Sequence, residues 1–382
     1  MEFRLTPEQE QFRDTLRRVV DSSEMAPDGA TAEGYAESWR NFAALGVAGL
    51  CVSEVQGGFS GAPEDIALVA MELGRAPTAT PRIENGAAAA MLLAKARTAL
   101  AVERLESFIA GDCCPAIAFA EGNRADGVEI VQTKAAITDG GFELTGQKVA
   151  VVAGGTADLL LITAILPDGT LGLFAVDPSV AGIERFPYRL ADTTPVADVR
   201  MTAATVPAAA LMLRGSEALV ALEEALDTAT VALCAASVGG MERSVELTIE
   251  YLKTRKQFGH PLAEFQALQH QVADIFMLAT NARSSLYAAI AALGGRARER
   301  RIAVSGCKIT VSAAAKEVTG RALHLHGGIG FTTEYAVGHL FRRAMVDEQL
   351  FGNAEFHLDR RIAQRRIEES DNADPPERLA VA

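Results

Sequence analysis

The spacing of apolar residues predicts helices along the first third of the chain. Thr6 and Gln9 have the pattern of a capping box at a helix start. Apolar side chains then recur at helical spacing, at Phe12, Leu16, Val19 and Val20. Two further helical stretches cover 66–73 and 85–108. We therefore predict an all-helical N-terminal domain over residues 1–112.

The pattern changes to short β-prone runs in the middle of the chain. Between Cys114 and Pro207, runs rich in Val, Ile and Leu are separated by glycine and proline turns, such as Gly140-Gly141 and Gly154-Gly155. We predict a β domain over residues 113–212, which is the size of a small sandwich or barrel.

Helical spacing returns in the last part of the chain and predicts four long helices. They cover 217–253, 264–293, 298–324 and 334–365. Because short connections join them, we expect an antiparallel four-helix bundle over 213–368. The tail at 369–382 is polar and contains proline, which predicts disorder. The fold class is therefore expected to be α+β, in the order helical, β, helical.

Composition narrows the class of protein. The 382 residues are 49% hydrophobic and 22% charged, as in globular proteins. The net charge of −13 argues against nucleic acid or an anionic membrane as the main partner. The five cysteines lack metal-site spacing, and we interpret them as reduced thiols in a cytoplasmic protein. The start of the chain does not have the pattern of a signal peptide, and no apolar run is long enough to cross a membrane.

A basic turn near residue 255 carries the first candidate chemistry. The helix predicted at 217–253 ends in a cluster of cations, after which Gly259 and Pro261 stop it. One interpretation is a helix end whose dipole favours positive charge. The other is a diphosphate site, because Arg255 has a planar fork suited to phosphate oxygens and Phe258 adds a flat apolar face.

A second stretch favours the diphosphate site. Residues 324–335 read HLHGGIGFTTEY, and glycines at this density allow a close backbone approach to a ligand. The order Y-x-x-x-R-x-Q-F-G, then F-Q, then H-G-G-x-G-F-x-x-E-Y resembles the C-terminal domain of the acyl-CoA dehydrogenase family. The E-x-x-G-G turn and the ELGR sequence of the first third also resemble this family, so the resemblance covers nearly the whole chain.

The resemblance implies a cofactor and the residues that hold it. In the family, residues of these motifs bind the adenosine diphosphate arm of FAD across a subunit interface, for the flavin of the neighbouring subunit. Carried onto this sequence, they are Arg255, Gln257, Phe258, Gln266, His324, Gly327 and Gly328. His324 is a departure, because the family usually has glutamine there.

The family's catalytic base is missing from both positions where it is known. The family removes the α-proton of an acyl-CoA thioester with a carboxylate while flavin accepts the β-hydride. The glutamate of its Y-E-G-T motif corresponds to Phe351, and the alternative seat corresponds to Ala229. Asp227 is near the second seat but about 200° away around the helix. Glu355 is a second candidate, although a residue on a helix face is the simpler interpretation of it. We therefore assign no catalytic residue to this chain.

The family's contacts with the flavin ring are also altered. The T-E-P-x-x-G-S-D loop corresponds to 120–127, where Ala120 and Asp126 replace the threonine and serine. The W-I-T strand corresponds to Ala150-Val151-Val152. Each lost partner of a buried polar edge costs about 1–3 kcal/mol, and several together weaken binding more than about a hundredfold.

Together the motifs indicate an incomplete subunit. The half-site lent to a neighbour is retained, while the chain's own half is degraded. This resembles the incomplete member of actinobacterial heteromeric acyl-CoA dehydrogenases of steroid catabolism. The resemblance implies a heterotetramer with a catalytic paralogue, shared FAD, an acyl-CoA substrate and an electron-transfer flavoprotein or similar acceptor. Two alternatives remain open: an autonomous homomeric flavoenzyme with a relocated base, and a non-catalytic acyl-CoA-binding or scaffold protein.

Overall fold

The computed structural model describes residues 5–22, 32–76, 82–122 and 131–371. Five helices come first: α1 (Pro7–Ser22), α2 (Ala32–Ala44), α3 (Pro63–Gly74), α4 (Ile83–Ala96) and α5 (Ala99–Ala110). The capping box predicted at α1 is present, since Gln9 N donates to Thr6 Oγ1 at 3.2 Å and Thr6 N donates to Gln9 Oε1 at 3.0 Å. The predicted N-terminal helical layer is confirmed.

An eight-stranded sheet follows. Its strands are β1 (Pro115–Ala118), β2 (Lys134–Thr138), β3 (Gly141–Val152), β4 (Leu159–Ile165), β5 (Leu171–Val176), β6 (Ile183–Arg189), β7 (Pro195–Pro207) and β8 (Leu211–Arg214). The order is β6-β7-β3-β2-β4-β5-β8, and β1 pairs with β4. β1 and β2 run parallel to β4, and the other pairs are antiparallel. The predicted change from helix to strand is therefore confirmed.

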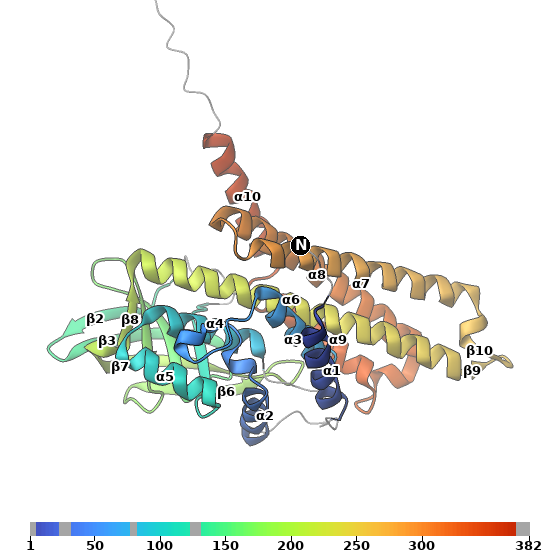
Figure 1. Ribbon diagram of the computed structural model, residues 1–382, viewed down its shortest axis with the longest axis horizontal. Coiled ribbons are helices and arrows are strands. Elements are labelled where there is room, and N and C mark those ends of the chain that lie inside the picture. The colour runs from blue at the N-terminus through green and yellow to red at the C-terminus, as the bar shows by residue number, and fades with distance from the viewer. Residues whose placement is uncertain (1–4, 23–31, 77–81, 123–130, 372–382) are drawn as a thin grey trace, which may run out of the picture.

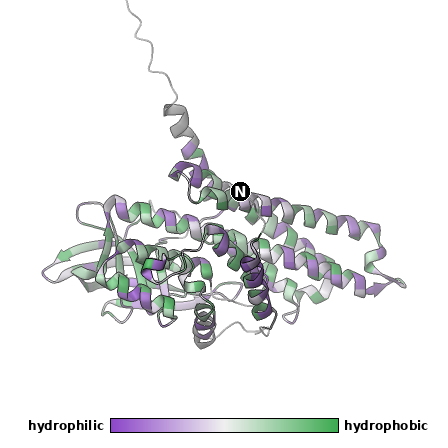
Figure 2. Cartoon of the chain, in the orientation of Figure 1, coloured by the Kyte–Doolittle hydropathy of each residue, from purple (hydrophilic) through white to green (hydrophobic). Residues whose placement is uncertain are grey.

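The C-terminal part is helical again. Its helices are α6 (Gly215–Thr254), α7 (Gln266–Ala292), α8 (Ala297–His326), α9 (Ala336–Gln349) and α10 (Ala354–Asp371). A two-stranded hairpin, β9 (Lys256–Gln257) and β10 (His260–Pro261), joins α6 to α7. Figure 1 shows α6 running along much of the molecule, from the sheet to this hairpin. Figure 2 shows hydrophilic residues on α1 and around the hairpin.

One sequence expectation about the bundle is wrong. A single helix was predicted over 334–365, but the chain forms α9 and α10 with a break between them. The break lies at Phe351 and Gly352, which have φ values of 57° and 96°. Two consecutive left-handed residues cannot continue a right-handed helix. α10 extends to Asp371, so the predicted tail begins inside it, and the rest of that tail, 372–382, lies outside the described residues.

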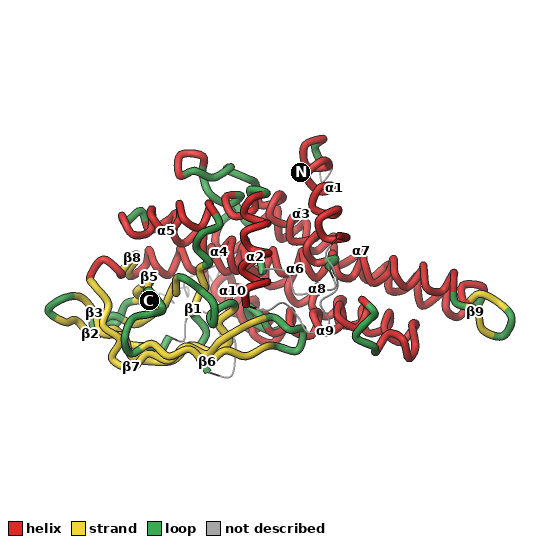
Figure 3. Tube along the Cα trace, turned by 90° about the horizontal axis from the view of Figure 1, so that it is seen from below, coloured by secondary structure: helices red, strands yellow, loops and turns green. Residues whose placement is uncertain are grey.

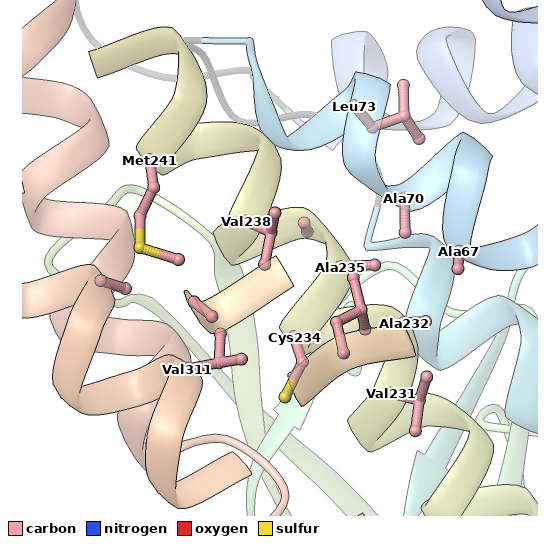
Figure 4. Close-up of a cluster of buried hydrophobic side chains, with 14 of the residues drawn as sticks. Ala67, Ala70, Leu73, Val231, Ala232, Cys234, Ala235, Val238, Met241 and Val311 are labelled. Carbon is pink, nitrogen blue, oxygen red and sulfur yellow. The ribbon is translucent and has the colours of Figure 1, made fainter. Parts of the chain in front are cut away.

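The core places α6 between the two halves of the molecule. The first half of α6 packs with α4 and the sheet, and its second half packs with α3, α7 and α8. Figure 4 shows the small side chains where α3 and α6 cross, including Ala70 and Ala235. Glycines allow the backbones to approach: a Cβ on Gly239 would lie 1.9 Å from Met71 O, and one on Gly74 would lie 1.9 Å from Ala236 O.

Gly239→Ala is expected to destabilise the protein. The added methyl group meets backbone, which cannot rotate away, so α3 and α6 must separate. Overpacking of this kind costs about 1–3 kcal/mol of unfolding free energy. The measurement is denaturant unfolding. Gly140→Ala is the matched control, because nothing lies within 4 Å of its added Cβ. Equal stability of the two variants would contradict the close crossing.

Candidate functional site

A cavity of about 590 Å³ lies where the helical layers meet the sheet. This volume is typical of small-molecule sites. The walls come from α4, from β1 and the loop after it, from β3, from the β6–β7 region and from the end of α9. The lining residues are Asn85, Ile117, Phe119, Ala120, Gly122, Val149, Ala150, Val151, Val152, Tyr188, Leu190, Ala191, Asp198, Met345, Val346, Gln349, Leu350 and Phe351.

The β3 wall contains an irregularity held by a carboxylate. The register between β3 and β7 shifts between Lys148 and Val151. Ala150, at this shift, has a φ of 49°, a conformation that costs free energy for a residue with a side chain. Its amide donates to Asp198 Oδ1 at 3.0 Å, and the Tyr188 hydroxyl donates to the same oxygen at 3.0 Å. Burial and the adjacent Asp198 raise the pKa of Tyr188.

The loop after β1 is anchored by a buried ion pair. Glu121 accepts hydrogen bonds from Lys148 Nζ, from Thr133 Oγ1 at 2.6 Å and from Gln132 N at 2.6 Å. Burial lowers the pKa of Lys148 to about 8, although Glu121 opposes the shift. Burial raises the pKa of Glu121, but Lys148 and the hydrogen bonds from Thr133 and Gln132 together outweigh burial, so the net shift is downward. Glu121 therefore holds the loop against the sheet and is not positioned as a base.

Two buried side chains, from α8 and α10, hold the break between α9 and α10 in place. Buried Lys308 donates to the carbonyl oxygens of Asp347 and Leu350, the latter at 2.9 Å. These are carbonyls at the end of α9, which no longer have a partner within the helix. Buried His357 donates through Nε2 to Phe351 O at 3.0 Å, and its Nδ1 lies 3.1 Å from Ser305 Oγ. The hydrogen bonds of Lys308 and His357 therefore fix the position of residue 351.

Phe351 itself faces another aromatic ring. Its ring is parallel to that of Phe119 within 5°, with 6.2 Å between centroids. It also packs against the core cluster that contains Ala229, which is fully buried on α6. The two positions where the sequence analysis expected the family's base therefore carry apolar side chains that belong to one core cluster, and Phe351 also lines the cavity.

The two candidate relocated bases lie elsewhere. Asp227 is buried and bound by two arginines, with Arg300 Nε at 2.9 Å and an Arg360 nitrogen at 2.6 Å. Glu355 is exposed on the first turn of α10. Neither is among the lining residues. Asp198 is the one carboxylate in the described part of the lining. Sequence reasoning missed it because no motif marks a single aspartate within a strand.

The positions expected to contact a flavin ring do line the cavity, but with side chains that cannot donate hydrogen bonds. Ala120, Ala150 and Val152 are all in its walls. Asp126 lies outside the described residues. The described side chains therefore do not fit the flavin ring in the manner the family motifs imply.

Four of the predicted diphosphate residues gather at the turn between α6 and α7. Arg255, Gln257, Phe258 and Gln266 are all exposed there. The amide of Leu262 donates to Arg255 O at 2.8 Å, which closes the turn. Phe258 has a φ of 54° and is 87% exposed, with its ring 6.2 Å from that of Phe265. A cation and an aromatic face are thus presented to solvent, as a partner-facing diphosphate site requires.

The other three form a second group at the end of α8. His324, Gly327 and Gly328 are exposed, and Gly327 has a φ of 64° and a ψ of −146°, a region open only to glycine. Tyr251, on the last turn of α6, stacks on His326 with centroids 4.6 Å apart. This contact brings the glycine turn close to the α6 end that precedes Arg255. We call the seven residues together the lending surface, after the role that the family resemblance implies for them.

The lending surface is far from the cavity within one chain. Arg255 is 26 residues along the helical direction from Ala229, which corresponds to about 39 Å. Figures 1 and 3 both show the β9–β10 hairpin at the end of the molecule opposite the sheet. One dinucleotide cannot span both regions of one chain.

The described part of the chain has neither a candidate metal centre nor a candidate membrane span. It contains no cluster of three or more His, Cys, Asp or Glu side chains arranged to hold a metal ion. None of its helices combines the length and the apolar character needed to cross a bilayer.

Comparison with known proteins defines the class. The N-terminal domain of acyl-CoA dehydrogenase matches residues 6–112, and its C-terminal domain matches 219–367. The chain belongs to the acyl-CoA dehydrogenase family. Acryloyl-CoA reductase (NADH) of Anaerotignum propionicum is 27% identical, covering 94% of each chain. Acyl-CoA dehydrogenase IpdE2 of Mycolicibacterium smegmatis is also 27% identical, covering 94% of this chain and 99% of IpdE2.

Solved structures agree with this class. A variant of the Tcur3481-Tcur3483 steroid ACAD matches with a TM-score of 0.84 at 26% identity, covering 95% of this chain and 99% of the other. The ChsE4-ChsE5 complex from Mycobacterium tuberculosis matches with a TM-score of 0.79 at 25% identity, covering 98% of this chain and 100% of the other. The predicted fold class and family are therefore confirmed. Members of this family are FAD-dependent oxidoreductases.

Acid is expected to destabilise the α9–α10 break through His357. Burial lowers the pKa of His357 to about 3, whereas the unfolded chain titrates near the ordinary 6.5. The unfolded state therefore binds more protons between these values, and stability falls as pH falls below about 6.5. Between pH 7 and pH 5 the loss is about 2 kcal/mol.

The comparison is between wild type and His357→Gln, unfolded by denaturant at both pH values. Glutamine can still donate to Phe351 O but does not titrate, so the acid loss should shrink by about 2 kcal/mol. The pKa of His326 is also lowered by burial, and its contribution is common to both proteins. An unchanged acid loss in the variant would show that His357 is not the group responsible.

Proposed function

We propose that this chain is a subunit of an FAD-dependent acyl-CoA dehydrogenase that works only as a hetero-oligomer. The reaction is the α,β-dehydrogenation of an acyl-CoA thioester, with a steroid-derived acyl group as the proposed class. This chain supplies the lending surface to the FAD of a catalytic partner. The base comes from the partner, because Phe351 and Ala229 occupy both of its seats here.

The main support for this proposal is the contrast between the lending surface and the cavity. The lending surface presents Arg255, Phe258 and the Gly327-Gly328 turn to solvent, where a second chain can reach them. The cavity offers no base at position 351 and no side-chain donors at Ala120 or Val152. About 39 Å of α6 separates the two sites. Lending to a neighbour therefore accounts for retained diphosphate residues in a chain with a degraded ring site.

The structural neighbours support the same proposal. Tcur3481-Tcur3483 is a steroid ACAD, and ChsE4-ChsE5 is a complex of two named proteins. By analogy, the proposed partner of this chain is a catalytic paralogue in a heterotetramer, and the electron acceptor is an electron-transfer flavoprotein or similar protein. We also propose that the protein is cytoplasmic and that its three domains end at residues 112, 212 and 368.

The chain purified alone is expected to hold little FAD and to show no acyl-CoA dehydrogenase activity. The reason is the loss of the base together with the ring contacts. The measurements are the 450 nm flavin band and dye reduction by acyl-CoA. Phe351→Glu alone should not restore activity, because Ala120 and Val152 still lack donors. Stoichiometric flavin with turnover in the isolated chain would favour an autonomous enzyme.

Arg255→Ala is expected to lower the FAD content of the complex, although the base lies in the other chain. A guanidinium–phosphate contact is charge-assisted and often bidentate, and contributes about 1.5–3 kcal/mol. Its loss corresponds to roughly ten- to a hundredfold in FAD affinity. Arg255→Lys should recover part of it, because the charge remains but the fork is lost. The measurement is FAD occupancy of the complex co-purified with its paralogue.

Lys253→Ala is the matched control. Lys253 is an exposed cation in the last turn of the same helix, so its loss has the same effect on the helix dipole. It should cost about 0.3–1 kcal/mol of stability and leave FAD occupancy unchanged. If Arg255→Ala behaves like Lys253→Ala, Arg255 only caps its helix, and the lending surface is rejected.

A further inference from the structure

Three polar side chains of the cavity each offer a hydrogen-bond acceptor. Among the described lining residues, Asp198 is the only carboxylate, and Asn85 and Gln349 are the only side-chain amides. Asn85 Nδ2 donates to Pro115 O at 3.2 Å, and Gln349 Nε2 donates to Glu348 Oε2 at 3.0 Å. One N–H of each amide is used on the protein, and the amide oxygen is left to accept. The cavity therefore offers acceptors from three separate elements.

Asp198 is the strongest of these acceptors. Its Oδ1 takes the hydrogen bonds of Ala150 N and the Tyr188 hydroxyl, each at 3.0 Å. Its Oδ2 accepts no hydrogen bond from the described residues. A carboxylate accepts through both oxygens, and hydrogen bonds to a charged group are stronger than neutral ones. A second acceptor oxygen is thus available at the cavity wall.

The position of Asp198 is fixed before any ligand arrives. It lies on β7, opposite Phe186 of β6, and next to Val199, which pairs with Lys148 of β3. Its contact with Ala150 retains a left-handed backbone that would otherwise be unfavourable. An acceptor held in this way loses little conformational entropy when it binds a ligand.

The other walls set the shape of the ligand. Phe119, Phe351, Leu190 and Val151 are apolar, and the two phenylalanine rings are parallel. Apolar walls with a few fixed polar groups are typical of small-molecule sites, and aromatic faces stack well on flat rings. The cavity thus favours a largely apolar ring system that carries a hydrogen-bond donor.

We propose that Asp198 is a specificity-determining residue that selects cavity ligands bearing a hydroxyl or ring N–H donor. This inference rests on the proposed function for the identity of the cavity as a ligand site. The donor has two sources, a hydroxyl on a polycyclic acyl group or the N3–H of a flavin ring. Both make the same contact with Asp198 Oδ2, and matched ligand pairs distinguish them.

The experiment measures dissociation constants of two ligand pairs for the full-length chain and for its complex. Testosterone and androstenedione differ in a hydroxyl against a ketone. Riboflavin and N3-methylriboflavin differ in the N3–H. If the donor is a steroid hydroxyl, wild type should bind testosterone about tenfold or more tightly than androstenedione. If the donor is the flavin N3–H, wild type should bind riboflavin about tenfold or more tightly than N3-methylriboflavin. Asp198→Asn keeps an oxygen for Ala150 N but replaces the carboxylate, and should reduce that preference to less than about threefold.

Tyr188→Phe is the second variant. It removes one hydrogen bond to Oδ1 and leaves the carboxylate in place, so the preference for the donor should persist. This variant keeps the test informative if Asp198→Asn does not fold, which thermal unfolding would show. A preference that survives in Asp198→Asn, or a wild type that binds neither member of either pair or binds both equally, overturns the inference.

The outcomes separate this inference from the proposed function. Discrimination in the steroid pair supports both. Tight, discriminating flavin binding by the chain alone supports the role of Asp198 but contradicts the degraded ring site. If neither pair discriminates while Arg255→Ala still lowers FAD in the complex, the inference on Asp198 fails and the lending surface stands.

Discussion

The arrangement of the three layers depends on one buried arginine. Arg82, at the start of α4, donates to Asp347 of α9 and to Asp192 and Thr194 of the β6–β7 connection. Burial opposes its charge, but Asp347, Asp192 and Glu84 together raise its pKa well above the ordinary value. Removing one member of a buried ion pair costs about 3–5 kcal/mol, because the remaining charge is left without compensation. The helical layer, the sheet and the bundle are thus joined at one point by charge.

The same network sets the cavity walls. Asn85 follows Arg82 by three residues, Ala191 precedes Asp192, and Val346 precedes Asp347, and all three neighbours line the cavity. Glu84 is also buried there, and burial raises its pKa despite the opposing Arg82. A cavity assembled from three layers keeps its shape only while those layers hold their positions. The acceptors of the cavity are therefore as fixed as the ion pairs behind them.

Much of the fold was predictable because it depends on local periodicity. The α6, α7 and α8 helices lie within a few residues of their predicted ranges, since apolar residues at helical spacing recur along their length. The break at Phe351 was not predicted, because its left-handed backbone depends on Lys308 and His357, which are distant along the chain or beyond the break. The Arg82 network and Asp198 were missed for a similar reason. Their partners come together only through tertiary packing, and no motif spacing records that.

The length of α6 links the two sites to one functional consequence. A rigid helix carries the chain from the cavity cluster at Ala229 to the turn at Arg255, about 39 Å away. Residues at one end of this helix cannot assist chemistry at the other end within one subunit. Under the proposed function, Phe351 leaves this chain without a base of its own, and the far end of α6 serves another chain. The cavity of this chain then serves to bind a ligand and not to remove a proton. A fixed hydrogen-bond acceptor such as Asp198 contributes to binding even when the cavity contains no catalytic base.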